Sequence, residues 1–235
     1  MALPDHGMSP EAIFAELDDL QRGDVQWRDG RAFSLVYYGG ADVSAVAEEA
    51  YRRYASENAL NTDAFPGLRA MQSEVVATVG EWLHAGPEGA GFMTSGGTES
   101  ILMAVKAARE RGKKERGIAS PNVVLPTSAH AAFEKGCYYF GLESRRVPVD
   151  SAWRADVDAM EAAIDDDTVL LVGSAPQCPQ GVIDPIPDIA ALAAERAFDS
   201  LRVPIRQVTA PHTPVPFSPP LEDLYIPSVE RVVDA

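Results

Sequence analysis

The sequence has few cysteines, few lysines and little positive charge, and these shortages exclude several classes of function. Only Cys137 and Cys178 occur among the 235 residues, without the spacing of metal ligands. We therefore expect a reduced, cytoplasmic protein with no metal site. The net charge of −15 at pH 7 argues against nucleic acid as a partner, because binding to phosphate backbones requires an excess of lysine and arginine.

Long hydrophobic runs are also missing. No stretch approaches the roughly 20 apolar residues that a membrane-spanning helix requires, so we expect no membrane span. Residues 1–7 contain neither a basic region nor an apolar run, so we expect no signal peptide. Hydrophobic residues nevertheless form 46% of the chain, which is typical of a globular protein with a substantial core.

Apolar strands alternate with amphipathic helices in the middle of the chain. Strands are predicted at residues 122–126, 144–149 and 168–172, and helices at 155–164 and 188–196. The first and last of these strands are almost wholly apolar, which is typical of a sheet covered on both faces. The pattern predicts an α/β fold with a parallel sheet and flanking helices. Upstream, Ser9-Pro10-Glu11 marks a helix start, and residues 42–58 form a helix pattern with Val46, Ala50, Tyr51 and Tyr54 pointing inward.

A turn rich in glycine, serine and threonine at residues 91–100 leads into a helix that is predicted to run to about Arg111. The first turn of a helix carries N–H groups without intrahelical partners, at the positive end of the dipole. Gly96 and Gly97 let an anion approach this backbone, and the hydroxyl of Thr98 adds a donor, so the turn is a candidate phosphate cup. The alternative is an ordinary helix cap formed by Ser95 or Thr98.

Three motifs, in this order, resemble the group II decarboxylases that use pyridoxal 5′-phosphate (PLP), and among these the sphingosine-1-phosphate lyases. They are TSGGTESI at 94–101, SAHAAFEKG at 128–136 and VGSAPQCPQGVIDPI at 172–186. The resemblance covers residues 30–196 and implies part of the large domain of a fold-type I PLP enzyme. It implies that Gly96, Gly97 and Thr98 bind the cofactor phosphate and that His130 stacks on the cofactor ring. Taken alone, His130 is more typical of a surface or helix-cap histidine.

The same resemblance implies further contacts. Tyr37 and Tyr38 would lie near the substrate phosphate, although aromatic packing is the favoured interpretation of this pair. Asn61 lies in a polar loop that, in the family, reaches the active site of a neighbouring subunit. The resemblance therefore implies a homo-oligomer, or association with another PLP-enzyme subunit.

Two of the contributions that PLP chemistry requires are missing from the sequence. In the family, a carboxylate that contacts the ring nitrogen follows the helix equivalent to 188–196, and the lysine that bonds the cofactor follows later. Here the only lysines are Lys106, Lys113, Lys114 and Lys135, none of them in that sequence context. We therefore assign no catalytic residue and expect no covalent attachment of PLP. We expect a fragment of a carbon–carbon lyase or decarboxylase that is inactive alone. The alternative is an interaction module that completes or pairs with a full-length PLP-enzyme subunit.

Proline dominates the end of the sequence, with seven prolines between residues 204 and 227. Such density forbids continuous helix or central strand and predicts an extended tail. Residues 189–235 resemble the C-terminal end of the beta subunit of thiamine-dependent 2-oxoacid dehydrogenases, so a fragment of that subunit is a further alternative. We predict three segments: a helical arm for dimer contact at 1–60, a partial PLP-binding domain at 61–196, and a tail of different origin at 197–235.

Overall fold

The computed structural model describes residues 6–32, 38–178 and 180–196, and the chain divides into two compact units, with the boundary between Ser56 and Glu57. The proline-rich tail lies outside the described residues. The three predicted segments therefore stay a prediction, although the boundary between the two units falls close to the end of the predicted arm.

The first unit consists of two helices and one short helical turn. These are α1 (Pro10–Gln21), η1 (Trp27–Asp29) and α2 (Ala41–Tyr54). The predicted start of α1 is confirmed, because Pro10 opens the helix and the Ser9 hydroxyl accepts a hydrogen bond from the Ala12 N–H at 3.3 Å. A serine cap followed by proline satisfies or removes donors that the first turn would otherwise leave unpaired.

The inward direction predicted for the apolar residues of α2 is wrong for this single chain. Val46 is 72% exposed and Tyr51 is 80% exposed, and neither α1 nor α2 contains a buried residue. The two helices of this unit therefore leave their apolar stripes largely exposed. Their apolar side chains therefore remain available for contacts beyond this unit.

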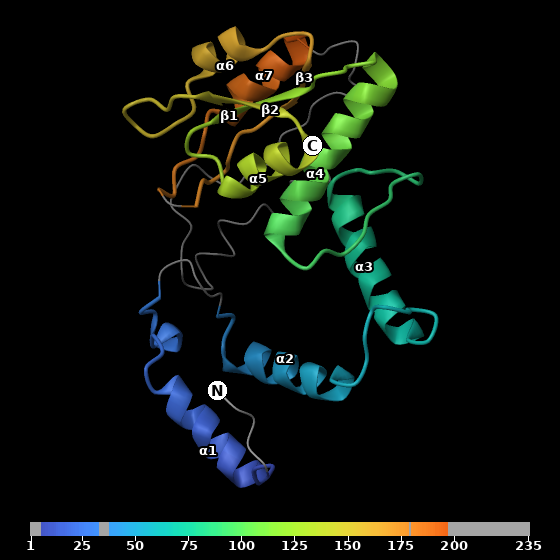
Figure 1. Cartoon of the computed structure of the whole chain (residues 1–235), viewed down its shortest axis with the longest axis vertical. Helices are drawn as coiled ribbons and strands as arrows, with labels where there is room; N and C mark the ends of the chain where they lie inside the picture. Colours follow the sequence, from blue (N-terminus) through green and yellow to red (C-terminus); the bar gives the residue numbers. More distant parts are fainter. Residues whose placement is uncertain (1–5, 33–37, 179, 197–235) are drawn as a thin grey trace. The chain divides into compact units, whose positions relative to one another are not determined.

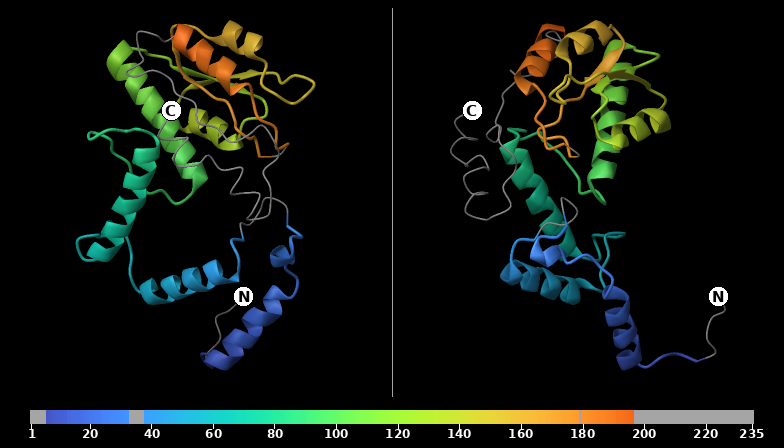
Figure 2. Two further views of the ribbon diagram at one scale, coloured as in Figure 1. Left: turned by 180° about the vertical axis from the view of Figure 1, so that it is seen from behind. Right: turned by 90° about the vertical axis from the view of Figure 1, so that its left-hand side faces the viewer.

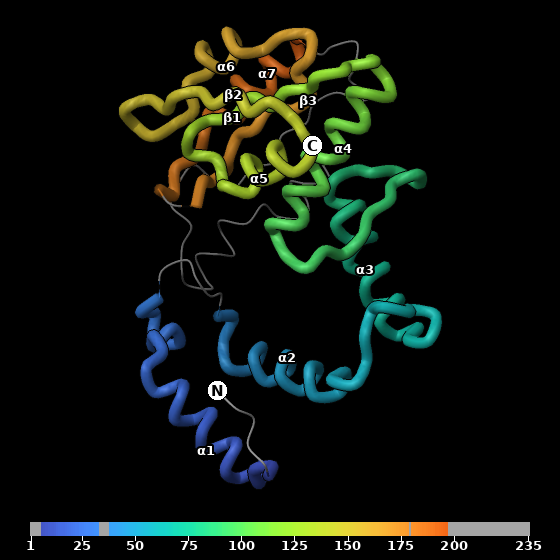
Figure 3. Tube along the Cα trace, in the orientation of Figure 1, coloured from blue at the N-terminus to red at the C-terminus, as the bar shows by residue number. Residues whose placement is uncertain are grey.

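The second unit contains α3 and an α/β layer structure. Helix α3 (Pro66–Trp82) precedes the glycine-rich turn. The sheet consists of three parallel strands in the order β2-β1-β3, and the trace in Figure 3 can be followed from β1 through α5 to β2 and through α6 to β3. The remaining elements are α4 (Gly97–Arg116), β1 (Asn122–Pro126), α5 (Ala131–Phe140), β2 (Glu143–Val147), α6 (Val157–Ala163), β3 (Thr168–Leu171) and α7 (Ile186–Arg196). The predicted α/β fold with a parallel sheet is confirmed.

Helices cover both faces of the sheet. Helices α4 and α5 lie on one side, and α6 and α7 lie on the other (Figures 1 and 2). The central strand β1 is buried throughout. Val123 and Leu125 pack toward α4 and α5, and Val124 packs toward α6 and α7. Alternate side chains of one strand therefore join two cores, as expected for a strand enclosed on both faces.

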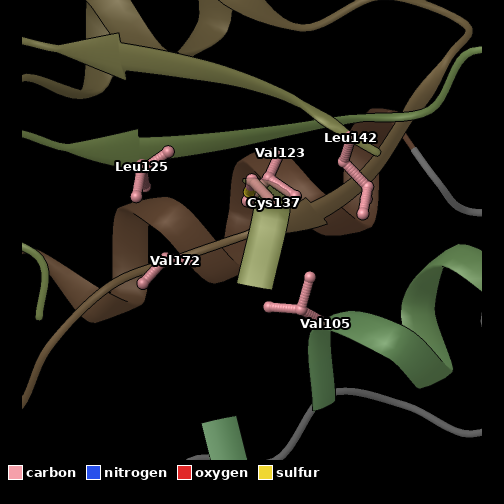
Figure 4. Packing of buried hydrophobic residues seen from close by; sticks show 6 residues of the cluster. All are labelled: Val105, Val123, Leu125, Cys137, Leu142 and Val172. Atoms are coloured by element: carbon pink, nitrogen blue, oxygen red, sulfur yellow. The ribbon is translucent and has the colours of Figure 1, made fainter. Parts of the chain in front are cut away.

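The core beneath α4 and α5 depends on a close helix contact. Figure 4 shows Val105 of α4 directed toward Val123 and Cys137, and all three side chains are buried. A Cβ atom on Gly136 would lie 3.1 Å from a methyl carbon of Val105, so glycine allows α5 to approach α4 at this point. Burial raises the pKa of the Cys137 thiol to about 11, so this cysteine is a core residue and not a nucleophile at neutral pH.

A polar network joins the strands at their amino ends. The Asp165 carboxylate accepts a hydrogen bond from the Asn122 side-chain amide at 2.8 Å and lies 2.6 Å from the Arg145 guanidinium. These contacts, the Asn122 hydrogen bond first, hold the pKa of Asp165 at about 2. The side chain of Asn122 is fully buried, and this network satisfies its polar atoms. In the part of the chain that the structure describes, no helix is long and apolar enough to cross a membrane.

Candidate functional site

The glycine-rich turn meets α4 in an unusual way for a helix start. Gly96 is the N-cap residue, and no side chain makes a capping hydrogen bond. Neither Ser95 nor Thr98 therefore caps the helix, as an ordinary cap would require. Among the described residues, the backbone N–H groups of Gly97 and Thr98 have no hydrogen-bond partner. They lie at the positive end of a helix of 20 residues.

Two side-chain contacts fold the turn onto the first turn of α4. The hydroxyl groups of Thr94 and Ser100 lie 2.7 Å apart. The backbone N–H and the hydroxyl of Ser95 both donate to the same carboxylate oxygen of Glu99, each at 2.6 Å. The hydroxyl and then the amide of Ser95 lower the pKa of Glu99 below its ordinary value, so this carboxylate is ionised at neutral pH.

Open space surrounds the two glycines of the turn. A Cβ atom placed on Gly96 or on Gly97 would meet no other atom within 4 Å. Free N–H groups, a nearby threonine hydroxyl and empty space at the positive end of a helix form the donor set that binds a phosphate group. The residues present in the turn therefore fit the phosphate end of PLP.

His130 is the N-cap residue of α5 and is separated from the end of β1 by three residues. Its Nδ1 atom accepts a hydrogen bond from the Ala132 N–H at 3.1 Å, and its side chain is otherwise exposed. Because Nδ1 is an acceptor, the neutral imidazole carries its proton on Nε2. The structure thus places His130 as a helix cap with a fixed ring orientation, and the ring remains accessible. Stacking on a cofactor stays a prediction.

The turn and His130 belong to the same edge of the sheet. In alternating α/β structures the helices run antiparallel to the strands, so the N-termini of α4 and α5 lie at the edge where the strands end. Two buried polar atoms without partners among the described residues also follow strand ends at this edge. They are Ser128 Oγ, after β1, and Gln177 Oε1, in the loop after β3.

A buried carboxylate locks the loop that follows β3. Asp184 is fully buried, and its two carboxylate oxygens accept hydrogen bonds from the Ala155 N–H at 2.9 Å and the Ser174 N–H at 2.8 Å. Gln177 lies in the same loop and donates from its side-chain amide to the Trp153 carbonyl. Sequence reasoning assigned no role to Asp184, Gln177 or Glu99, although all three lie within the quoted motifs.

None of the four lysines lies in the first turn of its helix. Lys106 is ten residues beyond Gly96, which corresponds to about 15 Å of helix axis, and both Lys106 and Lys135 are exposed. Lys113 and Lys114 are in the last turn of α4. No group of side chains suited to hold a metal ion occurs among residues 6–32, 38–178 and 180–196.

Two of the remaining predicted residues make local contacts within their own units. Tyr38, in the first unit, is 42% exposed and packs edge-on against Trp27 with ring centroids 5.7 Å apart. Asn61, in the second unit, accepts a hydrogen bond from the Asp63 N–H at 3.0 Å and thus shapes its own loop. Tyr37 lies outside the described residues. Roles of these three residues in substrate binding stay predictions.

Comparison with known proteins identifies similar sequences and folds. The family model described as the pyridoxal-dependent decarboxylase conserved domain matches residues 1–174. Sphingosine-1-phosphate lyase 1 of Rattus norvegicus is 44% identical over 82% of this chain and 34% of its own length. A probable L-tyrosine/L-aspartate decarboxylase of Methanoculleus marisnigri is 32% identical over 96% of this chain and 59% of its own length, an alignment that extends into residues 197–235.

Solved structures agree with the sequence matches. The sphingosine-1-phosphate lyase of Burkholderia pseudomallei superimposes with a TM-score of 0.76 and 38% identity, over 83% of this chain and 47% of that structure. Lactobacillus brevis glutamate decarboxylase, at 23% identity and a TM-score of 0.67, shares the fold. The chain spans about a third of the length of the curated rat, mouse and yeast sphingosine-1-phosphate lyases that it matches.

Proposed function

The chain belongs to the pyridoxal-dependent decarboxylase family, and from this premise we propose that it is the phosphate-binding part of a PLP-dependent carbon–carbon lyase or decarboxylase. PLP, the cofactor of this family, supplies an electron sink when bound. The observation that carries the proposal is the set of free N–H groups beside open space at Gly96 and Gly97, within the matched residues.

Each proposed contact uses atoms that the structure leaves accessible. The N–H groups of Gly97 and Thr98 and the Thr98 hydroxyl would bind the phosphate. His130 would contact the flat face of the ring, with its orientation fixed by the bond to Ala132. None of the four lysines has the sequence context of the family's cofactor lysine. Residues 1–235 would therefore bind the cofactor without a covalent bond and catalyse no reaction alone. Resemblance of the tail to a 2-oxoacid dehydrogenase supports no function in the described residues.

Binding of pyridoxine 5′-phosphate tests this proposal, since this vitamer has no aldehyde and cannot react with surface lysines. We expect it to bind at least tenfold more tightly than unphosphorylated pyridoxine in isothermal titration calorimetry, because the proposed contacts are to the phosphate. Borohydride treatment of the protein with PLP is expected to leave no stoichiometric adduct by mass spectrometry. Equal binding of the two vitamers would contradict the phosphate cup, and a stoichiometric adduct on Lys135 would contradict non-covalent binding.

A second role, association with another PLP-enzyme subunit, is favoured by the open edge of β3. Among the described residues, β3 pairs only with β1. Because the Val172 N–H donates to the Val124 carbonyl and bonding directions alternate along a strand, the backbone groups of Leu171 face away from β1. An open strand edge of this kind is a template for an added strand. A groove of about 520 Å³ runs along β3 between α4 and α7. The groove of about 910 Å³ formed by α3 and the loop after it lies elsewhere.

Self-association through this groove is the form of the second role that purified protein can test. Ala107 of α4 lines the groove and is exposed, so Ala107→Arg would place a long charged side chain in it. We expect this variant to weaken self-association at least tenfold in sedimentation equilibrium. Ala162→Arg, at an exposed position of α6 outside the groove, is the matched control. A wild-type protein that is monomeric at 100 micromolar would contradict self-association.

A further inference from the structure

Glu99 makes the shortest side-chain hydrogen bonds to the glycine-rich turn, yet neither proposed phosphate contact uses it. It stands three residues after the Gly96 cap. A glutamate at this position commonly reaches back to the backbone N–H of the cap residue. Here the carboxylate reaches one residue further, to the N–H and the hydroxyl of Ser95, at 2.6 Å each.

We propose that Glu99 is a positioning residue that holds the turn in its phosphate-binding shape, an inference that rests on the proposed function. By binding both donors of Ser95, Glu99 removes that residue from the set of groups that bind the ligand. The turn is thereby fixed so that the N–H groups of Gly97 and Thr98 remain without partners among the described residues, next to the open space around Gly96 and Gly97. The ligand thus meets a rigid pair of donors, which lowers the entropic cost of binding.

The contacts around the turn distinguish this role from competition with the phosphate. A competing carboxylate would occupy the donors that the phosphate needs, but Glu99 binds Ser95 and leaves Gly97 and Thr98 without partners among the described residues. The Thr94 and Ser100 hydroxyls, 2.7 Å apart, make a second connection across the same turn. Ser95 and Glu99 are therefore one of two braces on the turn.

Three variants test the role of Glu99, with pyridoxine 5′-phosphate as the probe in calorimetry. Glu99→Ala removes the brace and is expected to weaken binding about tenfold. Glu99→Gln keeps a carbonyl oxygen that can accept from Ser95, so binding within threefold of wild type is expected. Ser95→Ala combined with Glu99→Ala should bind no more weakly than Glu99→Ala alone, because both changes break the same contact.

Controls separate positioning from folding and from overall charge. Glu110 is an exposed glutamate of the same helix that contacts Arg109, and Glu110→Ala is expected to bind within twofold of wild type. The Ser95 amide should lose protection from hydrogen exchange in Glu99→Ala and keep it in Glu110→Ala, with or without the probe.

The possible results give distinct conclusions. The inference would be overturned if wild-type protein binds the probe and Glu99→Ala binds it equally well or more tightly. The proposed function would then remain intact. If Glu99→Gln binds the probe as weakly as Glu99→Ala does, the hydrogen bonds to Ser95 do not hold the turn, and the charge of Glu99 accounts for the effect. Wild-type protein that does not distinguish the phosphorylated from the unphosphorylated vitamer would overturn the proposed function, and the inference with it.

Discussion

Asp184→Ala is expected to lower the free energy of unfolding by about 3–5 kcal/mol, the largest effect of any single substitution considered for this chain. The carboxylate is fully buried, and each of its oxygens accepts a backbone N–H, from Ala155 and from Ser174. Alanine would leave the buried N–H of Ala155 and the partly buried N–H of Ser174 without this partner. Hydrogen bonds to a charged group contribute about 1.5–3 kcal/mol each, so losing two of them accounts for the expected size.

The contribution of the Asp184 hydrogen bonds can be separated from that of the side-chain volume. Asp184→Asn keeps the size of the side chain but replaces one acceptor with an NH₂ donor, which would face a backbone N–H. We expect it to lose about half as much stability as Asp184→Ala. Asp166→Asn, at an exposed carboxylate, is the control and should change stability by less than about 0.5 kcal/mol.

Urea unfolding followed by circular dichroism measures these differences. If the free energy of unfolding of Asp184→Ala is within 1 kcal/mol of the wild-type value, the two N–H groups have found other partners and Asp184 does not stabilise the loop. If the loss is confirmed, the loop that carries Gln177 depends on Asp184 for its position beside the carboxyl ends of the strands.

The fold was predictable because its signals are local. The largely apolar run at residues 122–126 predicts a covered strand, and the structure buries all five residues. The extent of α4 was less predictable. The helix was expected to end near Arg111 but continues to Arg116, since Lys113, Lys114 and Glu115 are good helix formers. Gly117, with a φ of 69°, provides the left-handed end that stops it.

The polar supports of the site were not predictable, because their partners are distant in sequence. Asp184 bonds to Ala155, 29 residues away, and Gln177 to Trp153, 24 residues away. Periodicity carries no information about such pairs. The brace at Glu99 involves residues only four apart, so a glutamate three positions after a glycine cap was a usable signal. The exposed apolar stripe of α2 shows a limit of local patterns. An amphipathic pattern predicts an apolar face, but it does not predict whether this chain covers that face.

Gly97→Asp is expected to weaken binding of pyridoxine 5′-phosphate at least about 30-fold while leaving the fold intact. The new carboxylate would occupy the open space beside the free N–H groups and would lie within about 4–5 Å of a bound phosphate. Repulsion between like charges at such distances costs about 2–4 kcal/mol at a partly exposed site, and 2 kcal/mol corresponds to about 30-fold in affinity.

The same substitution should not destabilise the helix, which makes the expected loss specific to the ligand. Gly97 is the first residue of α4, and a Cβ atom there meets no neighbour within 4 Å. A carboxylate in the first turn stabilises a helix by about 0.3–1 kcal/mol through its dipole. The melting temperature of Gly97→Asp is therefore expected to equal or exceed that of wild type.

Two matched variants complete this test. Gly23→Asp adds the same charge at a glycine that also has open space around it and is expected to leave binding unchanged. Gly97→Ala adds only a methyl group and should weaken binding by less than Gly97→Asp, since bulk is added without charge. If Gly97→Asp melts as wild type does and still binds the phosphorylated vitamer equally well, the anion site lies elsewhere and the free donors of α4 are an ordinary exposed helix end.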